Sequence, residues 1–397
     1  MLGGKGLFHL STVLIYDIII KNKILNLTGE KMKVILNGNE LGDALQKVVK
    51  ALPLKRSNPI LECVKISAVG DVITLFATDL ELAIEKKINA EVLIEGEVVV
   101  PGKLFAEYAK RIGDEQIELD GTAQNKLSVK YLDSEVFINC YSADEYPVFK
   151  EVEKDHSFII LKKDFKELIG KVKFNVAMDE TRPSLRGICL NIKETELEGV
   201  ASDGYRLALS KMPIQNNGII DKIVVPAKSM NELSSLLDDE NETLTVYVDR
   251  SYIMIDLFHT KMVSRLIAED YINYEKIIPN VFTTEVTIDK KQFENSIERV
   301  SLINRSEKKA YVKMEIKEDS ISLNAHSEEG EINEKVTIGL KGKDLTIGFN
   351  SKYISECMKA IQDPFVTLNF TSSTAPGIIK GEQDSWLYLI LPLRVIG

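Results

Sequence analysis

One pattern occurs three times along this chain, and the repeat limits the possible folds more than any single residue does. An apolar strand followed at once by a helical segment spans Val98–Ile112, returns at Ile223–Leu237, and occurs more faintly at Thr346–Ile361. A period of well over 100 residues is far longer than a solenoid repeat and corresponds to a whole domain. The sequence therefore predicts three similar domains in tandem.

The spacing of matching residues supports this prediction. Pro101 and Pro226 are 125 positions apart, and the equivalent Asn350 follows 124 positions later. A second marker agrees, because Ala77–Ile84 (ATDLELAI) matches Ala201–Leu209 (ASDGYRLAL). Each domain also opens with a short strand and a helix. These openings are Val34–Leu52, Phe158–Val172 and Val286–Ile303.

Length and composition fit this division. A chain of 397 residues accommodates three domains of roughly 120 residues, each large enough to bury its own core. Hydrophobic residues at 44% and charged residues at 28% are typical of a soluble globular protein. The four cysteines form no C-x-x-C pair, so we expect free thiols in a reducing cytoplasm. Cys63 and Cys189 occupy matching positions in two repeats and are better explained as core residues than as reactive ones.

The first 31 residues stand outside the repeat. Leu7–Ile20 is apolar, but His9 and Asp17 interrupt it and no small-residue cleavage site follows. It is also too short to span a membrane, and no other stretch of the sequence is a candidate span. We expect residues 1–31 to be a disordered extension or the result of a start codon assigned too early.

Within each domain, helices with apolar residues at i, i+3, i+4 and i+7 alternate with short strands of alternating hydrophobicity. We therefore predict an α+β fold in which each domain packs two helices on antiparallel sheet. The expected domains are 32–152, 153–281 and 282–397. The predicted core positions of the helices are Leu41, Ala44, Leu45, Val48, Val49 and Leu52; Leu104, Tyr108 and Ile112; Phe165, Leu168, Ile169 and Val172; Met230, Leu233 and Leu237; Phe293, Ile297 and Val300; and Ile354, Met358 and Ile361.

Charge is distributed unevenly between these helices and the rest of the chain. The six helical segments together carry +9, whereas the whole chain carries −10, which leaves −19 elsewhere. The apolar stripes face the sheets, so we expect the basic side chains on the outer helix faces. These are Lys47, Lys50, Lys110, Lys171, Lys173, Arg299 and Lys359. Lysine-rich helix faces are often merely solvated, but a basic surface repeated in three domains would suit phosphate contacts that read no bases.

No pattern of a catalytic, metal or cofactor site is present. The sequence has neither a G-x-x-x-x-G-K-[ST] loop, nor a G-x-G-x-x-G turn after a strand, nor a G-x-S-x-G elbow. The histidines His9, His156, His259 and His326 are far apart and lack metal-ligand spacing. We predict no catalytic residue, no metal and no cofactor.

With these observations in place, the chain from Met32 to its end resembles the bacterial DNA polymerase III beta subunit, the DNA sliding clamp. The resemblance rests on five stretches. They are ATDLELAI from Ala77, MDETRPSLRG from Met178, ASDGYRLA from Ala201, SRLIAEDYINYEKIIP from Ser264 and LILPLR from Leu389. It implies a non-enzymatic processivity factor whose head-to-tail homodimer closes a six-domain ring around duplex DNA, with helices inside and sheets outside.

The resemblance also implies a pocket that receives short peptides from the polymerase III alpha subunit, the clamp loader, and other clamp-binding polymerases and repair proteins. The positions that match the family's pocket are Leu185, Ser202, Gly204, Tyr205, Arg206, Leu207, Ile272, Ile277, Leu389, Leu391, Pro392, Leu393 and Arg394. Without the resemblance, a terminal core strand would be the preferred explanation of the LILPL stretch. Ile272 replaces a proline that relatives often have, and the tail continues through Val395–Gly397 beyond Arg394, so this pocket rim departs from the family pattern.

Two further sets follow from the resemblance. DNA contacts are expected from Lys55 or Arg56, which compete for one family arginine, and from Arg182. Apolar contacts across the dimer interface are expected from Leu302 and Ile303 of the third domain, opposite Phe137 of the first. The family implies a cytoplasmic, nucleoid-associated protein. Two other functions stay open from the sequence: an enzyme whose site lies between triplicated domains, and a peptide-binding scaffold without a DNA role.

Overall fold

The computed structural model describes residues 32–55, 58–123, 125–148, 150–179, 181–237, 241–304, 310–381 and 385–394. They belong to two compact units: one runs to Glu151 and includes Asp256–Val263, and the other comprises Val152–Ile255 and the chain from Ser264 onward. The expectations for residues 1–31, for Arg56 and for the tail 395–397 concern segments outside the described residues.

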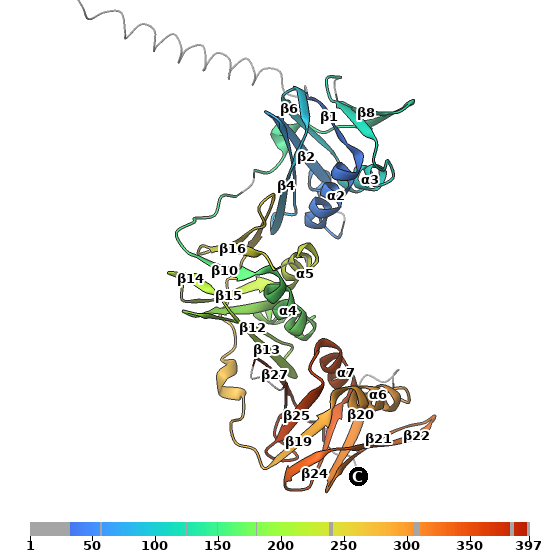
Figure 1. Cartoon of the computed structure of the whole chain (residues 1–397), viewed down its shortest axis with the longest axis vertical. Helices are drawn as coiled ribbons and strands as arrows, with labels where there is room; N and C mark the ends of the chain where they lie inside the picture. Colours follow the sequence, from blue (N-terminus) through green and yellow to red (C-terminus); the bar gives the residue numbers. More distant parts are fainter. Residues whose placement is uncertain are drawn as a thin grey trace, which may run out of the picture. The chain divides into compact units, whose positions relative to one another are not determined.

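The first unit holds helices α2 (Gly38–Val48) and α3 (Gly102–Ala109), which pack against each other (Figure 1). One sheet has the order β5-β1-β7-β8-β9, and in a second sheet β6, β2, β3 and β4 are successive neighbours, with β18 beside β4. The strands are β1 (Lys33–Asn37), β2 (Cys63–Val69), β3 (Val72–Thr78), β4 (Leu82–Asn89), β5 (Glu91–Ile94), β6 (Gly96–Pro101), β7 (Gln116–Asp120), β8 (Lys126–Tyr131), β9 (Ser134–Asn139) and β18 (Thr260–Arg265).

The second unit contains two further pairs of helices: α4 (Lys162–Val172) with α5 (Ala227–Leu236), and α6 (Lys290–Ser301) with α7 (Ser351–Ala360). One long sheet runs through both halves of this unit in the order β15-β11-β12-β13-β27-β26-β25-β19-β23. Its strands are β11 (Gly187–Ile192), β12 (Glu196–Ser202), β13 (Arg206–Pro213), β15 (Asp221–Pro226), β19 (Thr284–Asp289), β23 (Gly339–Gly342), β25 (Phe365–Phe370), β26 (Gly377–Lys380) and β27 (Trp386–Ile390).

Two smaller groups of strands complete the second unit. β14 (Gln215–Asn217), β10 (Ser157–Leu161), β16 (Thr243–Val248) and β17 (Tyr252–Asp256) are successive neighbours, and so are β22 (Gly330–Thr337), β21 (Ser320–Ser327), β20 (Tyr311–Lys317) and β24 (Leu345–Asn350). Pairing is antiparallel, as between β12 and β13 and between β20 and β21. The α+β prediction of three tandem domains, each with two helices on antiparallel sheet, is therefore confirmed.

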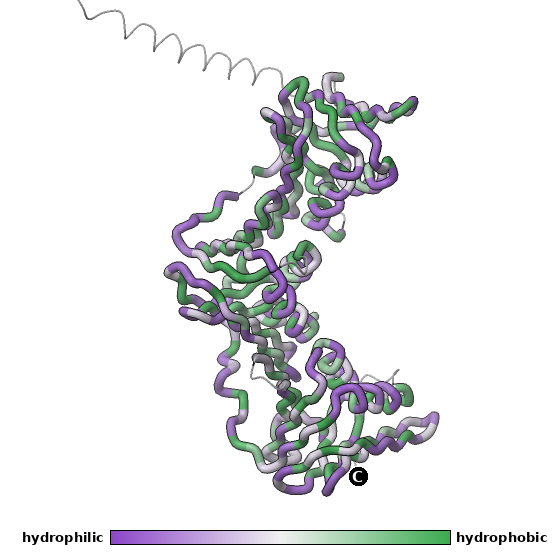
Figure 2. The backbone as a smooth tube through the Cα atoms, in the orientation of Figure 1, coloured by the Kyte–Doolittle hydropathy of each residue, from purple (hydrophilic) through white to green (hydrophobic). Residues whose placement is uncertain are grey.

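The repeat is visible at the junctions between strands and helices. β6 leads directly into α3, β15 into α5 and β24 into α7, at the three matched sequence segments. The entry residues fix these turns: Asn350 accepts a hydrogen bond from the backbone N–H of Lys352, and Pro101 and Pro226 restrict the backbone at the other two. Hydrophobic and hydrophilic segments alternate along the strands and helices (Figure 2).

The predicted core stripe is confirmed for α4, with Phe165, Leu168, Ile169 and Val172 all buried, but is wrong by one position in α3. Leu104 is 61% exposed, whereas Phe105 is fully buried. The start of α3 explains this, because a Cβ on Gly102 would lie 2.8 Å from a methyl carbon of Leu52. Gly102 therefore faces the core, and helical periodicity places residue 105, not 104, on the same face.

All four cysteines are free thiols, as predicted, and Cys63 and Cys189 are buried. Burial raises the pKa of the Cys63 thiol to about 11 and that of Cys189 to about 12. Both thiols are therefore protonated near neutral pH and act as small core side chains.

Candidate partner-peptide pocket

The turn between β12 and β13 carries four of the predicted pocket residues. The hydroxyl of Ser202 donates to the carbonyl oxygen of Arg206 at 2.8 Å, and the backbone N–H of Gly204 donates to that hydroxyl at 3.2 Å. Gly204 has a φ of 88°, which a residue with a Cβ adopts only with strain. Asp203 Oδ1 accepts the backbone N–H of Tyr205 at 2.9 Å, so the turn is rigid and presents Tyr205, which is 65% exposed.

Beside this turn lies an apolar cluster that draws on distant parts of the chain. Leu185, Leu207 and Leu389 are its buried members among the predicted pocket residues, and Ile272 packs against them half-buried. Strand pairing sets this convergence, because Leu207 of β13 lies opposite Leu389 of β27. The structure thus brings together residues from four separate stretches of sequence.

The remaining predicted residues form the edge of this region. Leu391 is 40% exposed, and its backbone N–H donates to the carbonyl oxygen of Tyr205 at 2.9 Å. Pro392 and Leu393 are half-buried and Arg394 is exposed, while the backbone N–H of Leu393 donates to the carbonyl oxygen of Gly348 at 2.8 Å. Ile277 is 46% exposed on the segment that follows Ile272.

Arg206 differs from the other pocket residues because its side chain is already engaged within the protein. It is 8% exposed, and its guanidinium donates to Asp203 at 2.9 Å, to Glu356 of α7 at 2.5 Å and to the carbonyl oxygen of Phe174 at 3.0 Å. It also lies over the ring of Tyr353, 4.3 Å from the centroid. Through these contacts Arg206 connects β13 to α7, and we expect its main effect on the predicted pocket to be structural.

A second buried charge lies on the same sheet. Glu198 of β12 is 4% exposed and pairs with Lys193 at 2.6 Å and Lys211 at 3.3 Å, and it accepts hydrogen bonds from Tyr274 and Asn191, each at 2.8 Å. Burial alone would raise the pKa of Glu198, but these charged and hydrogen-bonding partners outweigh burial and hold it below its ordinary value.

This lowered pKa has a consequence for stability. A carboxyl with a depressed pKa in the folded state stabilises the fold above its unfolded pKa of about 4.3, and this contribution is lost as pH falls through the folded value. We expect Glu198→Gln to be less stable than the parent at pH 7, and the difference to shrink towards pH 3.5. The measurement is the urea midpoint at each pH, followed through the single tryptophan, Trp386. A difference that stays constant with pH would contradict this assignment.

The structure places the predicted DNA-contact residues differently from one another. Lys55 is exposed. Arg182 is exposed too, but its guanidinium lies against the Gly204 turn, where a Cβ added to Gly204 would be 3.0 Å from Nη1. Arg182 is therefore a neighbour of the predicted partner-peptide pocket, and a contact with DNA stays a prediction for both residues.

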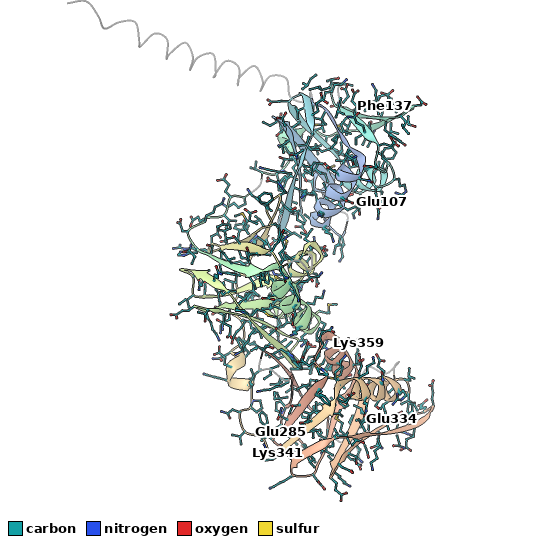
Figure 3. All side chains as sticks on the ribbon, in the orientation of Figure 1. Glu107, Phe137, Glu285, Glu334, Lys341 and Lys359 are labelled. Atoms are coloured by element: carbon teal, nitrogen blue, oxygen red, sulfur yellow. The ribbon has the colours of Figure 1, made fainter. Side chains whose placement is uncertain are left out.

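The predicted dimer residues lie on strand β9 and just after helix α6, and two of the three are exposed. Phe137 on β9 is 59% exposed, Leu302 after α6 is 60% exposed, and Ile303 is half-buried (Figure 3 labels Phe137). Among the described strands, β9 and β22 are each the last strand of their sheets, so each presents unpaired backbone groups along one side.

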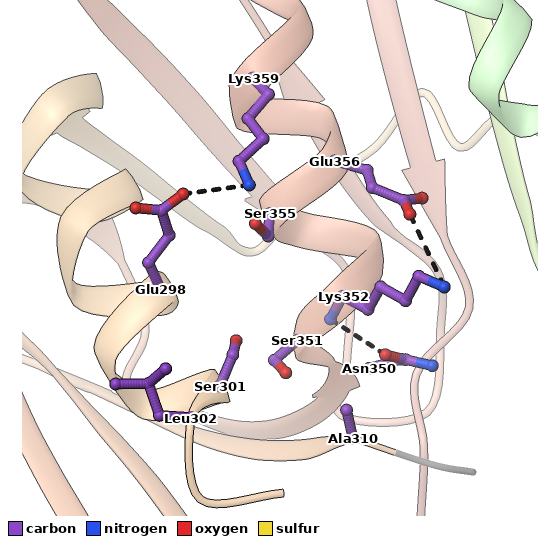
Figure 4. A pocket seen from close by; sticks show the side chains of 10 residues that line it. All are labelled: Glu298, Ser301, Leu302, Ala310, Asn350, Ser351, Lys352, Ser355, Glu356 and Lys359. Atoms are coloured by element: carbon purple, nitrogen blue, oxygen red, sulfur yellow. Dashed lines mark hydrogen bonds and ion pairs between the residues drawn. The ribbon is translucent and has the colours of Figure 1, made fainter. Parts of the chain in front are cut away.

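The basic helix faces are partly neutralised within the chain. Arg299 pairs with Glu334 at 2.7 Å and Lys359 with Glu298 at 3.1 Å, the latter across a cavity of about 740 Å³ between α6 and α7 (Figure 4). Lys47 and Lys110 are exposed, as predicted.

Lys171, in contrast, does not lie on an outer helix face. It is 7% exposed and pairs with Glu167 at 2.6 Å. Its carbonyl oxygen accepts a hydrogen bond from the hydroxyl of Tyr388. The prediction was wrong because α4 also contacts elements from a distant part of the sequence, namely Tyr388 of β27 and helix α7.

Sequence reasoning missed Asp203, Phe174, Tyr353 and Glu356 around Arg206, and Glu198 and Tyr274 beneath the cluster. Asp203 could have been found, because the ASDG stretch places a carboxylate in the turn beside Arg206. The other partners lie too far away in sequence to leave a local pattern. Glu356, for example, is 150 residues from Arg206.

Two kinds of feature are absent from the described residues. No group of three or more histidine, cysteine or acidic side chains in the described part of the chain could hold a metal ion. Among the described helices, none is long and apolar enough to cross a membrane.

Comparison with known proteins covers nearly the whole described chain. Family models of the DNA polymerase III beta subunit match in three blocks: the N-terminal domain at residues 32–150, the central domain at 159–273 and the C-terminal domain at 275–394. A beta sliding clamp from Halalkalibacterium halodurans is 31% identical over 362 residues, which is 87% of this chain and 95% of that protein. One from Staphylococcus epidermidis is 29% identical over 367 residues, covering 90% and 96%.

The fold agrees with these matches. The crystal structure of the DNA polymerase sliding clamp from Bacillus subtilis superposes with a TM-score of 0.89 at 28% identity, covering 92% of this chain and all of that one. Three matched domains in order, and relatives matched over almost their full length, leave one assignment: the chain belongs to the DNA polymerase III beta subunit family, the sliding clamps.

Proposed function

We propose that two copies of this sliding clamp close head to tail into a ring around duplex DNA and tether partner proteins through the partner-peptide pocket. The carrying observation is the match of all three domains, in order, to the beta subunit family. Membership of this family sets aside the alternative of an enzyme, because the beta subunit is a non-catalytic processivity factor. The ring would act where the chromosome is, in the cytoplasm and on the nucleoid.

Ring closure is supported by exposed apolar residues near the edges of two sheets. Phe137 lies on β9, the last strand of one sheet in the first unit, and Leu302 follows α6, which packs beside β22 at the end of another sheet. Pairing a first domain with a third domain of a second copy would cover both, and a heterologous contact of this kind can close into a ring. Ile303 belongs to the same proposed interface.

DNA would be held by topology and by weak, sequence-independent phosphate contacts. The helical segments carry +9 in a chain of net charge −10, so a helix-lined hole would attract DNA while the acidic remainder repels it. Lys55, Arg56 and Arg182 stay the proposed individual contacts. This part of the proposal needs neither a cofactor nor a metal.

The pocket would receive short peptides from the polymerase III alpha subunit, the clamp loader, and other polymerases and repair proteins. Its apolar cluster offers a place for aliphatic or aromatic anchors, and the tight Gly204 turn lets a peptide backbone approach closely. The hypothesis that LILPL is a terminal core strand is partly compatible with this, since Leu389 is buried in β27 while Leu391 beyond it is accessible.

A fluorescence-polarisation titration tests this pocket. Leu391→Asp should weaken binding of a labelled peptide from the polymerase III alpha subunit by at least about tenfold, because a charge replaces an apolar contact at the site. Val69→Asp, in the first unit and 66% exposed, is the matched control and should bind like the parent. Equal affinity for all three proteins would overturn the pocket assignment.

A further inference from the structure

The segment between β18 and β19 carries Ile272 and Ile277 of the proposed pocket, and we call residues 266–283 the connector. It contains a single short 3-10 turn, Tyr274–Ile277, and is otherwise irregular. An irregular segment of this length has no ladder of strand hydrogen bonds to hold it in place. Backbone hydrogen bonds fix its two ends: the Ile267 N–H donates to the Val224 carbonyl oxygen and the Thr283 N–H to the Phe370 carbonyl oxygen, each at 2.9 Å. Between these ends, its position against the sheet depends mainly on side chains.

Tyr274 lies at the centre of this contact. It is 1% exposed, and its ring belongs to the same apolar cluster as Leu207 and Leu389. Its hydroxyl extends beyond that cluster, donates to Glu198 Oε2 at 2.8 Å, and accepts a hydrogen bond from the Asn191 amide at 2.9 Å. Tyr274 thus joins the pocket's apolar floor to a polar network on β11 and β12.

Glu198 is bound tightly enough to act as a fixed point. Its Oε1 pairs with Lys193 and Lys211, while its Oε2 accepts from Tyr274 and Asn191, so both oxygens are engaged. The other charged groups nearby are Glu196, which also pairs with Lys193 at 3.6 Å, and Lys222, whose ammonium lies 4.9 Å from the Tyr274 ring centroid and 3.6 Å from Glu275. A carboxylate held by two lysines cannot follow Tyr274 if the connector moves.

We propose that Glu198 and Tyr274 form a positioning pair that holds the connector against β12 and thereby sets where Ile272 and Ile277 stand in the partner-peptide pocket. Neither residue touches the peptide; both act through the connector. This inference rests on the proposed function of the pocket and adds a residue pair that defines its shape. The apolar packing of the Tyr274 ring is the competing explanation, and it predicts no role for the hydroxyl.

Removing only the hydroxyl separates these explanations. Tyr274→Phe keeps the ring, so the pair predicts about five- to tenfold weaker binding of the labelled alpha-subunit peptide, as expected for losing a single hydrogen bond. Glu198→Gln keeps an acceptor oxygen and should restore part of the affinity relative to Glu198→Ala. Tyr247→Phe, a half-buried tyrosine in the same unit, is the matched control and should bind like the parent.

Two measurements keep positioning distinct from general stability. A core variant away from the connector, Val246→Ala, should lower the urea midpoint yet leave peptide affinity unchanged. In Tyr274→Phe, amide hydrogen exchange should rise in residues 271–278 but not in α4. Parent-like affinity together with parent-like exchange in Tyr274→Phe would overturn the pair, and so would a Val246→Ala variant that loses as much affinity.

The two proposals can fail separately. If the parent protein does not bind the peptide at all, the pocket is wrong and the role of the pair in that pocket falls with it. If the parent binds and Tyr274→Phe binds equally well, the pocket stands and only the positioning pair is wrong.

Discussion

Replacing Leu302 by aspartate should convert the proposed dimer into monomers at micromolar concentration. Leu302 is 60% exposed in the single chain, and the proposed interface would bury it. An unpaired buried charge costs about 3–5 kcal/mol. That cost corresponds to roughly a 150- to 4,000-fold rise in Kd, and a two-copy ring would carry the change at both interfaces.

Sedimentation equilibrium measures this directly, since the dimer has twice the 44.6 kDa mass of the chain. Ile220→Asp is the matched control, because Ile220 is 72% exposed in the same unit and outside the proposed interface. The circular dichroism spectrum should be unchanged in both variants, which shows that the domains still fold. A Leu302→Asp protein that stays dimeric at micromolar concentration would rule out this placement of the interface.

Replacing Arg206 by methionine should lower the free energy of unfolding of the second unit by about 2–3 kcal/mol. The change leaves Asp203 and Glu356 without their shared partner and removes the cation from the Tyr353 ring. The figure is reduced from the full cost of breaking a buried pair because the Glu356 side chain is 31% exposed.

Trp386 reports this unfolding, because it is the single tryptophan and is 1% exposed on β27, beside Arg206's strand. Urea titrations compare Arg206→Met with Arg182→Met, an exposed arginine near the same turn that should change stability by less than about 0.5 kcal/mol. Glu356→Gln combined with Arg206→Met should cost less than the sum of the two single changes. Equal stability of Arg206→Met and the parent would show that the contacts of Arg206 with Asp203 and Glu356 do not stabilise the second unit.

The repeat made most of the fold predictable from sequence. Strand-to-helix junctions at Pro101, Pro226 and Asn350 lie where the matched segments place them. The repeat also identifies the correct core position in α3. Phe105, Met230 and Ile354 are equivalent positions, and all three are buried. Within α3 alone, the regular spacing of Leu104, Tyr108 and Ile112 indicated the wrong helix face.

The site was less predictable, for a physical reason. The predicted pocket residues lie in local motifs, so a family resemblance can identify them, but the residues that support them are distant in sequence. Arg206 pairs with Glu356, 150 residues away, and Tyr274 of the connector bonds to Glu198, 76 residues away. Neither pair has a spacing or composition that distinguishes it from ordinary surface charges.

Lys171 is another residue whose environment depends on a contact far away in sequence. Its place on a basic helix predicted a solvated cation, yet the structure buries it beside Tyr388, 217 residues away. Helix periodicity identifies the face that packs on the domain's own sheet. It does not identify a face covered by the next domain.

Retention on DNA tests the ring most directly. The clamp is loaded by its clamp loader onto nicked circular DNA and separated from free protein by gel filtration, before and after the circle is cut with a restriction enzyme. The clamp should stay with circular DNA and be lost from the linear form, because a ring held by topology slides off free ends. Equal retention on both forms, or none on the circle, would contradict a closed ring.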